Sequence, residues 1–294
     1  MSVIRHSEGR LVVGVDLGGT QIRVLALVNG RPFGRYQGPT TDEEGLGNLL
    51  RKLWKREEWS ARSVAALVVA AKGIWTDGER RALAQRLDGL ARRVLVVPDA
   101  QAALLGALDG QAGVLILAGT GSIAVGRDRR GRWTRAGGLG PLLGDEGSGF
   151  WLGREWLRAT SRGDDILPAL ALLRSPNPVG RIAALAPGVI RRARRGHREA
   201  RRIVKSGQTS LAAHIADIVR RLRLTSPVLV SWAGSVLGDD WYRAGVGRQL
   251  ARAGLRARWI EPARPPVAAA ARLAERLASG RAGKNSSSTS KNSR

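Results

Sequence analysis

Residues 11–20 read LVVGVDLGGT, and residues 113–122 read GVLILAGTGS. Each stretch is an apolar run of strand length that ends in a turn rich in Gly and Thr, and each is followed by a second apolar run, at 21–28 and 123–127. The pattern therefore predicts two β-hairpins, one in each half of the chain. Glycine turns of this kind let backbone N–H groups approach a ligand closely.

The order of predicted elements is similar in the two halves. In the first half we expect strands near 11–16, 21–28 and 32–37, then helix 42–58, strand 65–71, helix 77–91, strand 93–97 and helix 99–108. In the second half we expect strands at 113–118, 123–127 and 132–136, helices over much of 150–224, strand 227–232, helix 239–253, strand 256–261 and helix 266–279. This internal repetition predicts a duplicated α/β unit that binds its ligand in a crevice between the halves.

The chain length and composition suit two lobes. With 294 residues, 43% of them hydrophobic, we expect lobes at 1–108 and 109–279 and a disordered, low-complexity tail at 280–294. No apolar run is long enough to span a membrane and no signal peptide is recognisable, so we expect a cytoplasmic protein. The absence of cysteine excludes disulfides, thiolate zinc sites and cysteine-bound iron–sulfur clusters.

The formal charge of +25 predicts attraction of polyanions, including nucleotides and phosphorylated sugars. The densest basic segment, RRARRGHREARRIVK at 191–205, has helical spacing and is typical of a solvated helix face. Few aromatic residues accompany the arginines, and no nucleic-acid-binding motif is present. The composition therefore does not favour nucleic acid as a partner.

The first Gly/Thr turn contains Asp16, Gly18, Gly19 and Thr20. The glycines and the threonine hydroxyl are suited to binding phosphate, and Asp16 at the strand end is suited to holding a hydrated Mg²⁺. A plain hairpin turn explains the same residues. The second turn, Gly119-Thr120-Gly121-Ser122, occupies the matching place in the second half, and the pairing favours a phosphate clamp with two sides.

Three further segments follow predicted strands. Asp99 comes directly after one and opens a helix, where it can act as a general base or as a helix N-cap. Lys72 ends another strand and faces the predicted cleft, where it either assists the substrate or only terminates the strand. Gly234-Ser235 follows a third strand and suits contact with adenosine, or an ordinary turn.

A glycine-rich segment covers residues 137–149 and contains GDEGS at 144–148. Asp145 in this segment is a candidate acceptor for sugar hydroxyls. The alternative is a purely structural role, in which the segment is a loop that caps the following helix with Asp145 or Ser148. That alternative accounts for the acidic residues but not for the long run of glycines before them.

The motifs GVDLGGT, VPDAQAALLGAL, LAGTGSIAVGR and GGLGPLLGDEGSGFWLGREWL together resemble the BadF/BadG/BcrA/BcrD ATPase family, and within it the N-acetylglucosamine and glucosamine kinases. The resemblance covers about residues 12–276. It implies a two-lobed actin-like fold of duplicated ribonuclease-H-like units, with ATP and Mg²⁺ as cofactors and a small amino sugar as substrate. Relatives are often dimers, so a homodimer is among the expectations.

The resemblance also assigns roles to individual residues. It implies that Asp16, Gly18, Gly19 and Thr20 contact phosphates and metal, and that Gly119–Ser122 form the second phosphate loop. Asp99 would take the proton from the sugar hydroxyl. The residues expected beside the sugar are Thr120, Gly121, Gly138 and Asp145, and those beside adenosine are Gly234 and Ser235.

Several residues depart from the family pattern on the acceptor side. Eukaryotic relatives carry Trp where this chain has Leu139, Asn is common where it has the segment 38–41, and small residues are usual where it has Lys72. Activators in the family need a cysteine-bound iron–sulfur cluster, so the absence of cysteine argues against that role. Repressor-type relatives carry an N-terminal DNA-binding domain, and we do not expect one here because the first predicted strand begins at about residue 11. The remaining alternative to a kinase is a catalytically idle nucleotide or sugar sensor.

Overall fold

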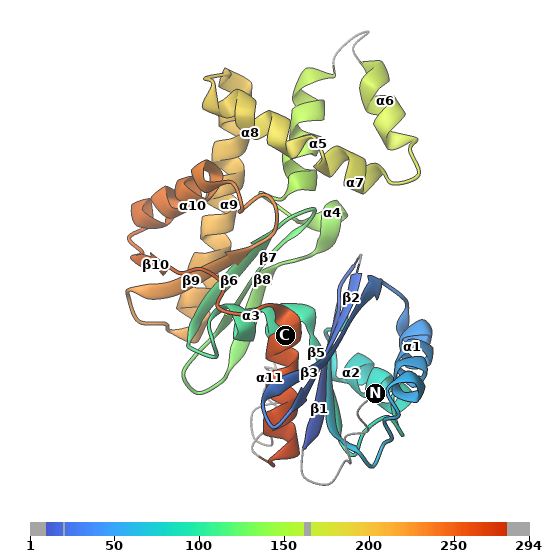
Figure 1. Ribbon diagram of the computed structural model, residues 1–294. Helices are drawn as coiled ribbons and strands as arrows, with labels where there is room; N and C mark the ends of the chain where they lie inside the picture. Colours follow the sequence, from blue (N-terminus) through green and yellow to red (C-terminus); the bar gives the residue numbers. More distant parts are fainter. Residues whose placement is uncertain (1–9, 20, 162–165, 281–294) are drawn as a thin grey trace. The chain divides into compact units, whose positions relative to one another are not determined.

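The computed structural model describes residues 10–19, 21–161 and 166–280. They form two compact units, each built on a five-stranded sheet (Figure 1). The first unit comprises the described residues of Met1–Asp109 and Ala263–Arg294, and the second comprises those of Gly110–Pro262. Apart from Gly280, the predicted tail lies outside the described residues.

The first sheet has the strand order β3-β2-β1-β4-β5. Its strands are β1 (Leu11–Leu17), β2 (Gln21–Val28), β3 (Arg31–Pro39), β4 (Val64–Ala71) and β5 (Val94–Pro98). β1 and β2 form the predicted antiparallel hairpin, whereas β1, β4 and β5 run parallel. β4 reads VAALVVAA and is buried along nearly its whole length, as a strand covered on both faces requires.

Helices cover both faces of this sheet. They are α1 (Glu43–Arg56), α2 (Asp77–Arg86), α3 (Asp99–Ala107) and α11 (Pro266–Ala278). α1 begins after Asp42, whose carboxylate accepts a hydrogen bond from Gly45 N at 2.8 Å, and α2 begins with a capping box formed by Thr76 and Glu79. Leucines of α1 and α2 pack on one face, while α11 and α3 pack on the other.

We predicted that the last helix, α11, belongs to the second lobe. The structure shows instead that α11 packs against β1, β4 and α3 of the first unit. The physical reason is a close approach between backbones: a methyl group on Gly14 would lie 2.2 Å from the backbone nitrogen of Ala271. The chain returns to this unit at Ala263, whose N–H donates to the carbonyl of Ala107 at 3.1 Å. The predicted boundary at residue 279 is therefore replaced by one at residue 262.

The second sheet repeats the order of the first as β8-β7-β6-β9-β10. Its strands are β6 (Gly113–Ala118), β7 (Ser122–Arg127), β8 (Trp133–Gly137), β9 (Val228–Ala233) and β10 (Ala257–Trp259). Again the first two strands form an antiparallel hairpin, and the fourth and fifth join the first in parallel. The predicted duplication of an α/β unit is thus confirmed.

The helices of the second unit are α4 (Gly140–Leu143), α5 (Gly149–Thr160), α6 (Leu167–Leu173), α7 (Pro178–Ala183), α8 (Ala186–Arg194), α9 (Arg198–Leu222) and α10 (Asp240–Arg252). Helices α5, α8, α9 and α10 contribute buried residues to one core with the sheet. The basic segment 191–205 is divided between α8 and α9, because Gly196 adopts a φ of 100° between them. Its basic side chains are all exposed, as expected for a solvated helix face.

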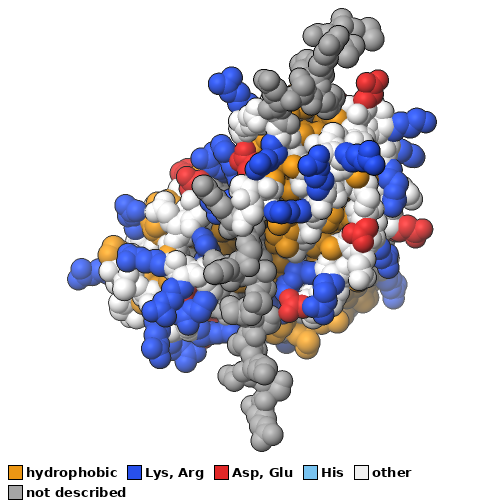
Figure 2. All heavy atoms as spheres, turned by 90° about the horizontal axis from the view of Figure 1, so that it is seen from below, with side chains coloured by type: hydrophobic (Ala, Val, Ile, Leu, Met, Phe, Trp, Pro, Cys, Tyr) orange, Lys and Arg blue, Asp and Glu red, His pale blue; other side chains and the backbone are white. Residues whose placement is uncertain are grey.

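Lys and Arg side chains are spread across the face seen in Figure 2 and do not gather in one field. Several arginines of the segment 191–205 already have partners within the protein: Arg194 pairs with Asp239 at 2.8 Å, and Arg192 lies over the ring of Trp156 at 5.1 Å. Among the described residues, no helix combines the length and apolar character needed to cross a membrane.

Candidate functional site

In the first unit, the candidate residues lie at the C-terminal ends of the parallel strands β1, β4 and β5. The last residues of these strands are in register across the sheet. Gly18, Lys72 and Asp99 come directly after them and therefore emerge side by side at one edge. The N–H of Lys72 donates to the carbonyl of Leu17 at 3.1 Å, which extends the pairing by one further step.

Asp16 lies near the end of β1 and is only 6% exposed. Its carboxylate pairs with Arg23 of β2 at 3.4 Å, and Arg23 also donates to Gln21 at 2.6 Å. Burial raises the pKa of Asp16, Arg23 opposes the rise, and the negative charge of Asp99 adds to it. The two carboxylates are therefore close enough to influence each other.

The turn after β1 is held by two hydrogen bonds. Gly18 N donates to the carbonyl of Gln21 at 3.0 Å, and the hydroxyl of Thr40 donates to the carbonyl of Gly18 at 2.6 Å. Thr40 was noted in the sequence only as a departure from the family pattern; its hydroxyl anchors the turn from the end of β3. The predicted phosphate contact Thr20 lies outside the described residues.

Asp99 is the first residue of α3, but it is not the N-cap, which is Pro98. One carboxylate oxygen accepts a hydrogen bond from Ala100 N at 2.7 Å, and the side chain is partly buried. Burial raises the pKa of Asp99, while the N–H of Ala100 and the charge of Lys72 act to lower it. A carboxylate that is buried enough to have a raised pKa, yet still accessible, suits proton transfer.

In the second unit, the turn Gly119–Gly121 is tied to the start of α5. Gly119 N donates to the carbonyl of Gly121 at 3.0 Å, Gly149 N donates to the carbonyl of Gly119 at 2.7 Å, and Phe150 N donates to the carbonyl of Thr120 at 3.1 Å. The turn therefore has a defined shape before any ligand arrives.

Asp145 packs directly on this second turn. It is 7% exposed, and one carboxylate oxygen accepts a hydrogen bond from Ser122 N at 3.1 Å. Gly121 makes room for it, since a methyl group there would lie 2.8 Å from the other carboxylate oxygen. The hydroxyl of Ser122 donates to the carbonyl of Glu146 at 2.8 Å. The structure thus brings Gly121, Ser122 and Asp145 together and uses Ser122 to hold the GDEGS segment.

The glycine-rich segment before Asp145 makes a tight bend over β7. Gly138 has a φ of 70°, and a methyl group there would lie 2.6 Å from Ile123. The next residue, Leu139, is 61% exposed. Helix α5 itself is capped by Ser148, which accepts from Trp151 N at 3.1 Å. The glycines are therefore needed for backbone conformation and close packing.

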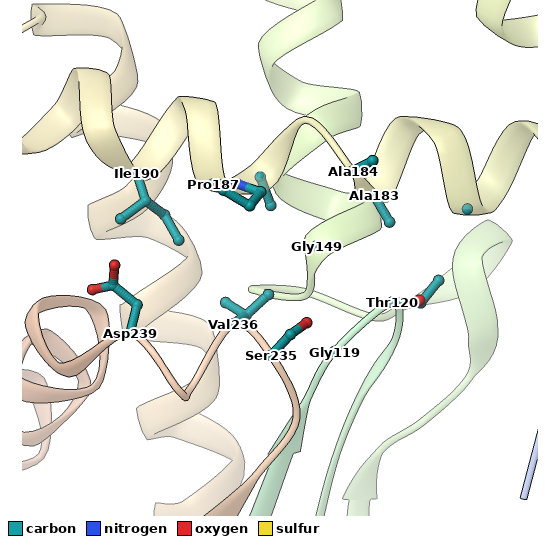
Figure 3. Close-up of a pocket in the computed structure, with 12 residues that line it drawn as sticks. Gly119, Thr120, Gly149, Ala183, Ala184, Pro187, Ile190, Ser235, Val236 and Asp239 are labelled. Atoms are coloured by element: carbon teal, nitrogen blue, oxygen red, sulfur yellow. The ribbon is translucent and has the colours of Figure 1, made fainter.

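A pocket of about 370 Å³ lies beside the second turn (Figure 3). Gly119, Thr120 and Ser235 line one side of it. Gly234 has a φ of 94°, and a methyl group there would lie 2.4 Å from the carbonyl of Ala118, so the segment after β9 presses closely on the end of β6. Two regions that the sequence predicted separately, as phosphate loop and adenosine contact, therefore line one pocket.

The opposite wall of the pocket comes from α7 and α8 and was missed by the sequence analysis. It is made of the small or apolar residues Ala183, Ala186, Pro187 and Ile190. The only sequence feature that could have indicated this wall was the run of small residues in RIAALAPG at 181–188. Such a run is also typical of an ordinary connection between two helices. Asp239 lies at the rim, where it caps α10 by accepting from Tyr242 N at 2.9 Å.

Among the described residues, no group of three or more Asp, Glu or His side chains could enclose a metal ion. Mg²⁺ in phosphoryl-transfer sites is commonly held by one or two carboxylates together with substrate phosphates and water. Asp16, with Asp99 close to it, fits that manner of binding.

Residues 13–271 match the model of the BadF/BadG/BcrA/BcrD ATPase family, and the chain belongs to this family. It is 28% identical to the N-acetylmuramic acid/N-acetylglucosamine kinase of Clostridium acetobutylicum, over 79% of this chain and 87% of the relative. It is also 28% identical to the N-acetyl-D-glucosamine kinase of Dictyostelium discoideum, over 53% of this chain and 55% of the relative.

Solved structures confirm the actin-like, hexokinase-type fold. A protein from Chromobacterium violaceum assigned as an N-acetylglucosamine kinase superposes with a TM-score of 0.65 at 22% identity, covering 89% of this chain and 97% of the other. The ROK hexokinase from Thermus thermophilus superposes with a TM-score of 0.60 at 19% identity, covering 89% and 97%. At these identities the likeness concerns the fold alone.

Proposed function

We propose that the protein is an ATP-dependent kinase that phosphorylates an amino sugar, N-acetylglucosamine or glucosamine. The observation that carries the proposal is the position of Asp99, a partly buried carboxylate with a raised pKa at the same edge of the sheet as the Gly18–Gly19 turn. The two curated relatives, both named as kinases that act on N-acetylated amino sugars, support this class of acceptor.

In the proposed reaction, Asp99 accepts the proton of the acceptor hydroxyl. The hydroxyl oxygen forms a bond to the γ-phosphorus of ATP, and the bond between that phosphorus and the bridging oxygen breaks, leaving ADP. The backbone N–H groups of Gly18, Gly119 and Ser122 hold the two turns in shape. Those of Gly19, Thr120 and Gly121 would bind the phosphates, and Asp16 would hold Mg²⁺. The bound ion supplies positive charge that offsets the charge of the phosphates.

We assign the pocket beside Gly119 to adenosine. Its volume of about 370 Å³ and its small, apolar wall from α7 and α8 suit a planar base, and Ser235 offers a hydroxyl at its edge. Gly119 and Thr120 line the same pocket, so a nucleotide bound there would bring its phosphates toward the second turn.

The sugar is assigned to the side of the second turn formed by Thr120, Gly121, Gly138 and Asp145. Asp145 already accepts a hydrogen bond from Ser122 N at 3.1 Å, so any sugar hydroxyl would share a carboxylate that the protein holds in place. We place this reaction in the cytoplasm, where ATP is abundant, and the homodimer stays a prediction from the family resemblance.

The test is a coupled assay of ADP release, with the purified chain offered N-acetylglucosamine, glucosamine, a muramic-type sugar and glucose. We expect release that depends on an amino sugar and on Mg²⁺. If glucose were the only one of the four sugars to cause ADP release, the result would contradict the amino-sugar assignment. Binding of ATP without release for any acceptor would instead support the sensor, the second candidate function.

A further inference from the structure

Lys72 has a side chain that folds back over the first turn. A methyl group on Gly19 would lie 2.7 Å from Nζ of Lys72 and 3.3 Å from its Cδ, so both the ammonium group and part of the stem cover this glycine. The residue is exposed, and its backbone is fixed by the hydrogen bond to Leu17 at 3.1 Å. A lysine that merely ended the strand would be free to extend into solvent.

The two candidate carboxylates of the first unit, Asp16 and Asp99, are each influenced by a cation. The two cations differ in whether they have other partners. Arg23 is engaged by Asp16 at 3.4 Å and by Gln21 at 2.6 Å. Lys72 acts on Asp99 through its charge, yet in the described part of the chain its ammonium group has no hydrogen-bond or ion-pair partner. Its three donors are therefore available to a ligand at the turn.

We propose that Lys72 is a catalytic residue, whose ammonium group binds the γ-phosphoryl oxygens of ATP over the Gly18–Gly19 turn. The proposal rests on the kinase function stated above. Charge is spread over the three outer oxygens of the phosphoryl group as it passes from ADP to the acceptor oxygen, while the hydroxyl proton goes to Asp99. An ammonium group already positioned there stabilises that charge without reorganisation.

The first test compares Lys72→Met with Lys72→Arg and with the control Lys52→Met, which removes an exposed lysine of α1 in the same unit. We expect kcat of Lys72→Met to fall about 100- to 1,000-fold, the usual effect of removing one donor to transition-state charge. Lys72→Arg should retain more activity, and Lys52→Met should match the wild type. Circular dichroism and melting curves verify that each variant is folded.

The second test needs no acceptor and so separates this proposal from the proposed kinase function. Isothermal titration calorimetry measures the affinity of each variant for ADP and for the non-hydrolysable analogue AMP-PNP. Lys72→Met should bind the analogue at least about tenfold more weakly, the effect of about 1.4 kcal/mol, with its ADP affinity unchanged. Equal losses for both nucleotides, or no loss for either, would overturn the assignment even if the wild type proves to be an active kinase.

Discussion

Gly14 of β1 and Ala271 of α11 meet backbone to backbone, since a methyl group on Gly14 would lie 2.2 Å from the nitrogen of Ala271. The neighbouring positions of α11, Ala270 and Ala274, are fully buried alanines. Small residues on both elements therefore allow α11 to lie directly on β1, the strand that carries Asp16.

We predict that Gly14→Ala destabilises the first unit, because α11 must move away from β1 to accommodate the methyl group. The expected loss is about 1–3 kcal/mol of unfolding free energy, measured by urea denaturation. The matched control is Gly34→Ala on β3, where a methyl group would make only ordinary contacts at 3.6 Å or more. Equal stability of the two variants would show that the close contact between β1 and α11 does not form.

Asp99→Asn should abolish phosphorylation while leaving ATP binding intact. Loss of a general base typically lowers the rate by about 10²- to 10⁴-fold, and the amide preserves an oxygen that can still accept from Ala100 N. The measurement is kcat in the ADP-release assay beside the affinity for AMP-PNP. Asp88→Asn, at an exposed position after α2, is the control. An unchanged kcat in Asp99→Asn would remove Asp99 from the role of base.

The same variant should be at least as stable as the wild type near neutral pH. Burial raises the folded-state pKa of Asp99, so between the ordinary pKa and the raised one the folded protein holds a proton that the unfolded chain has lost. Stability contributed by this group therefore falls as pH rises through that window, and Asn avoids the loss. Melting curves at low and neutral pH should show the benefit of Asp99→Asn only at neutral pH; a lower melting temperature at neutral pH would contradict it.

Ala183→Leu should weaken ATP binding by narrowing the assigned adenosine pocket. The Ala183 side chain points into the space above Thr120 in Figure 3. We expect the dissociation constant for ATP to rise about tenfold, equivalent to about 1.4 kcal/mol, with kcat at saturation nearly unchanged. Ala171→Leu, at an exposed position of α6, is the control. A wild-type affinity in Ala183→Leu would place the base elsewhere.

Features that depend on neighbouring residues could be predicted from the sequence. The two hairpins, their glycine turns and the repeated order of strands appear at nearly the predicted positions, because apolar runs of strand length and turn residues act locally. The starts of several helices were also close to the predicted positions: α1 begins at Glu43, and Ser148, one of the two caps offered, caps α5.

Features that depend on distant residues could not be predicted. The unit in which α11 packs is decided by its contact with Gly14, which lies more than two hundred and fifty residues away in the sequence. The wall of the pocket combines α7 and α8 with the turn at Gly119. From the sequence, Asp99 was suited both to act as a general base and to cap a helix. Only the structure, in which Pro98 is the N-cap of α3, shows that Asp99 does not hold that position.

The sequence by itself therefore determined the duplicated α/β units, the family and the residues at the two turns, since short-range patterns suffice for these. The tertiary structure decided which of those residues share a surface. It brought Lys72 over Gly19, Thr40 to the carbonyl of Gly18, and Asp145 against Gly121. Side-chain contacts of this kind follow from strand register and backbone approach, which no local pattern records.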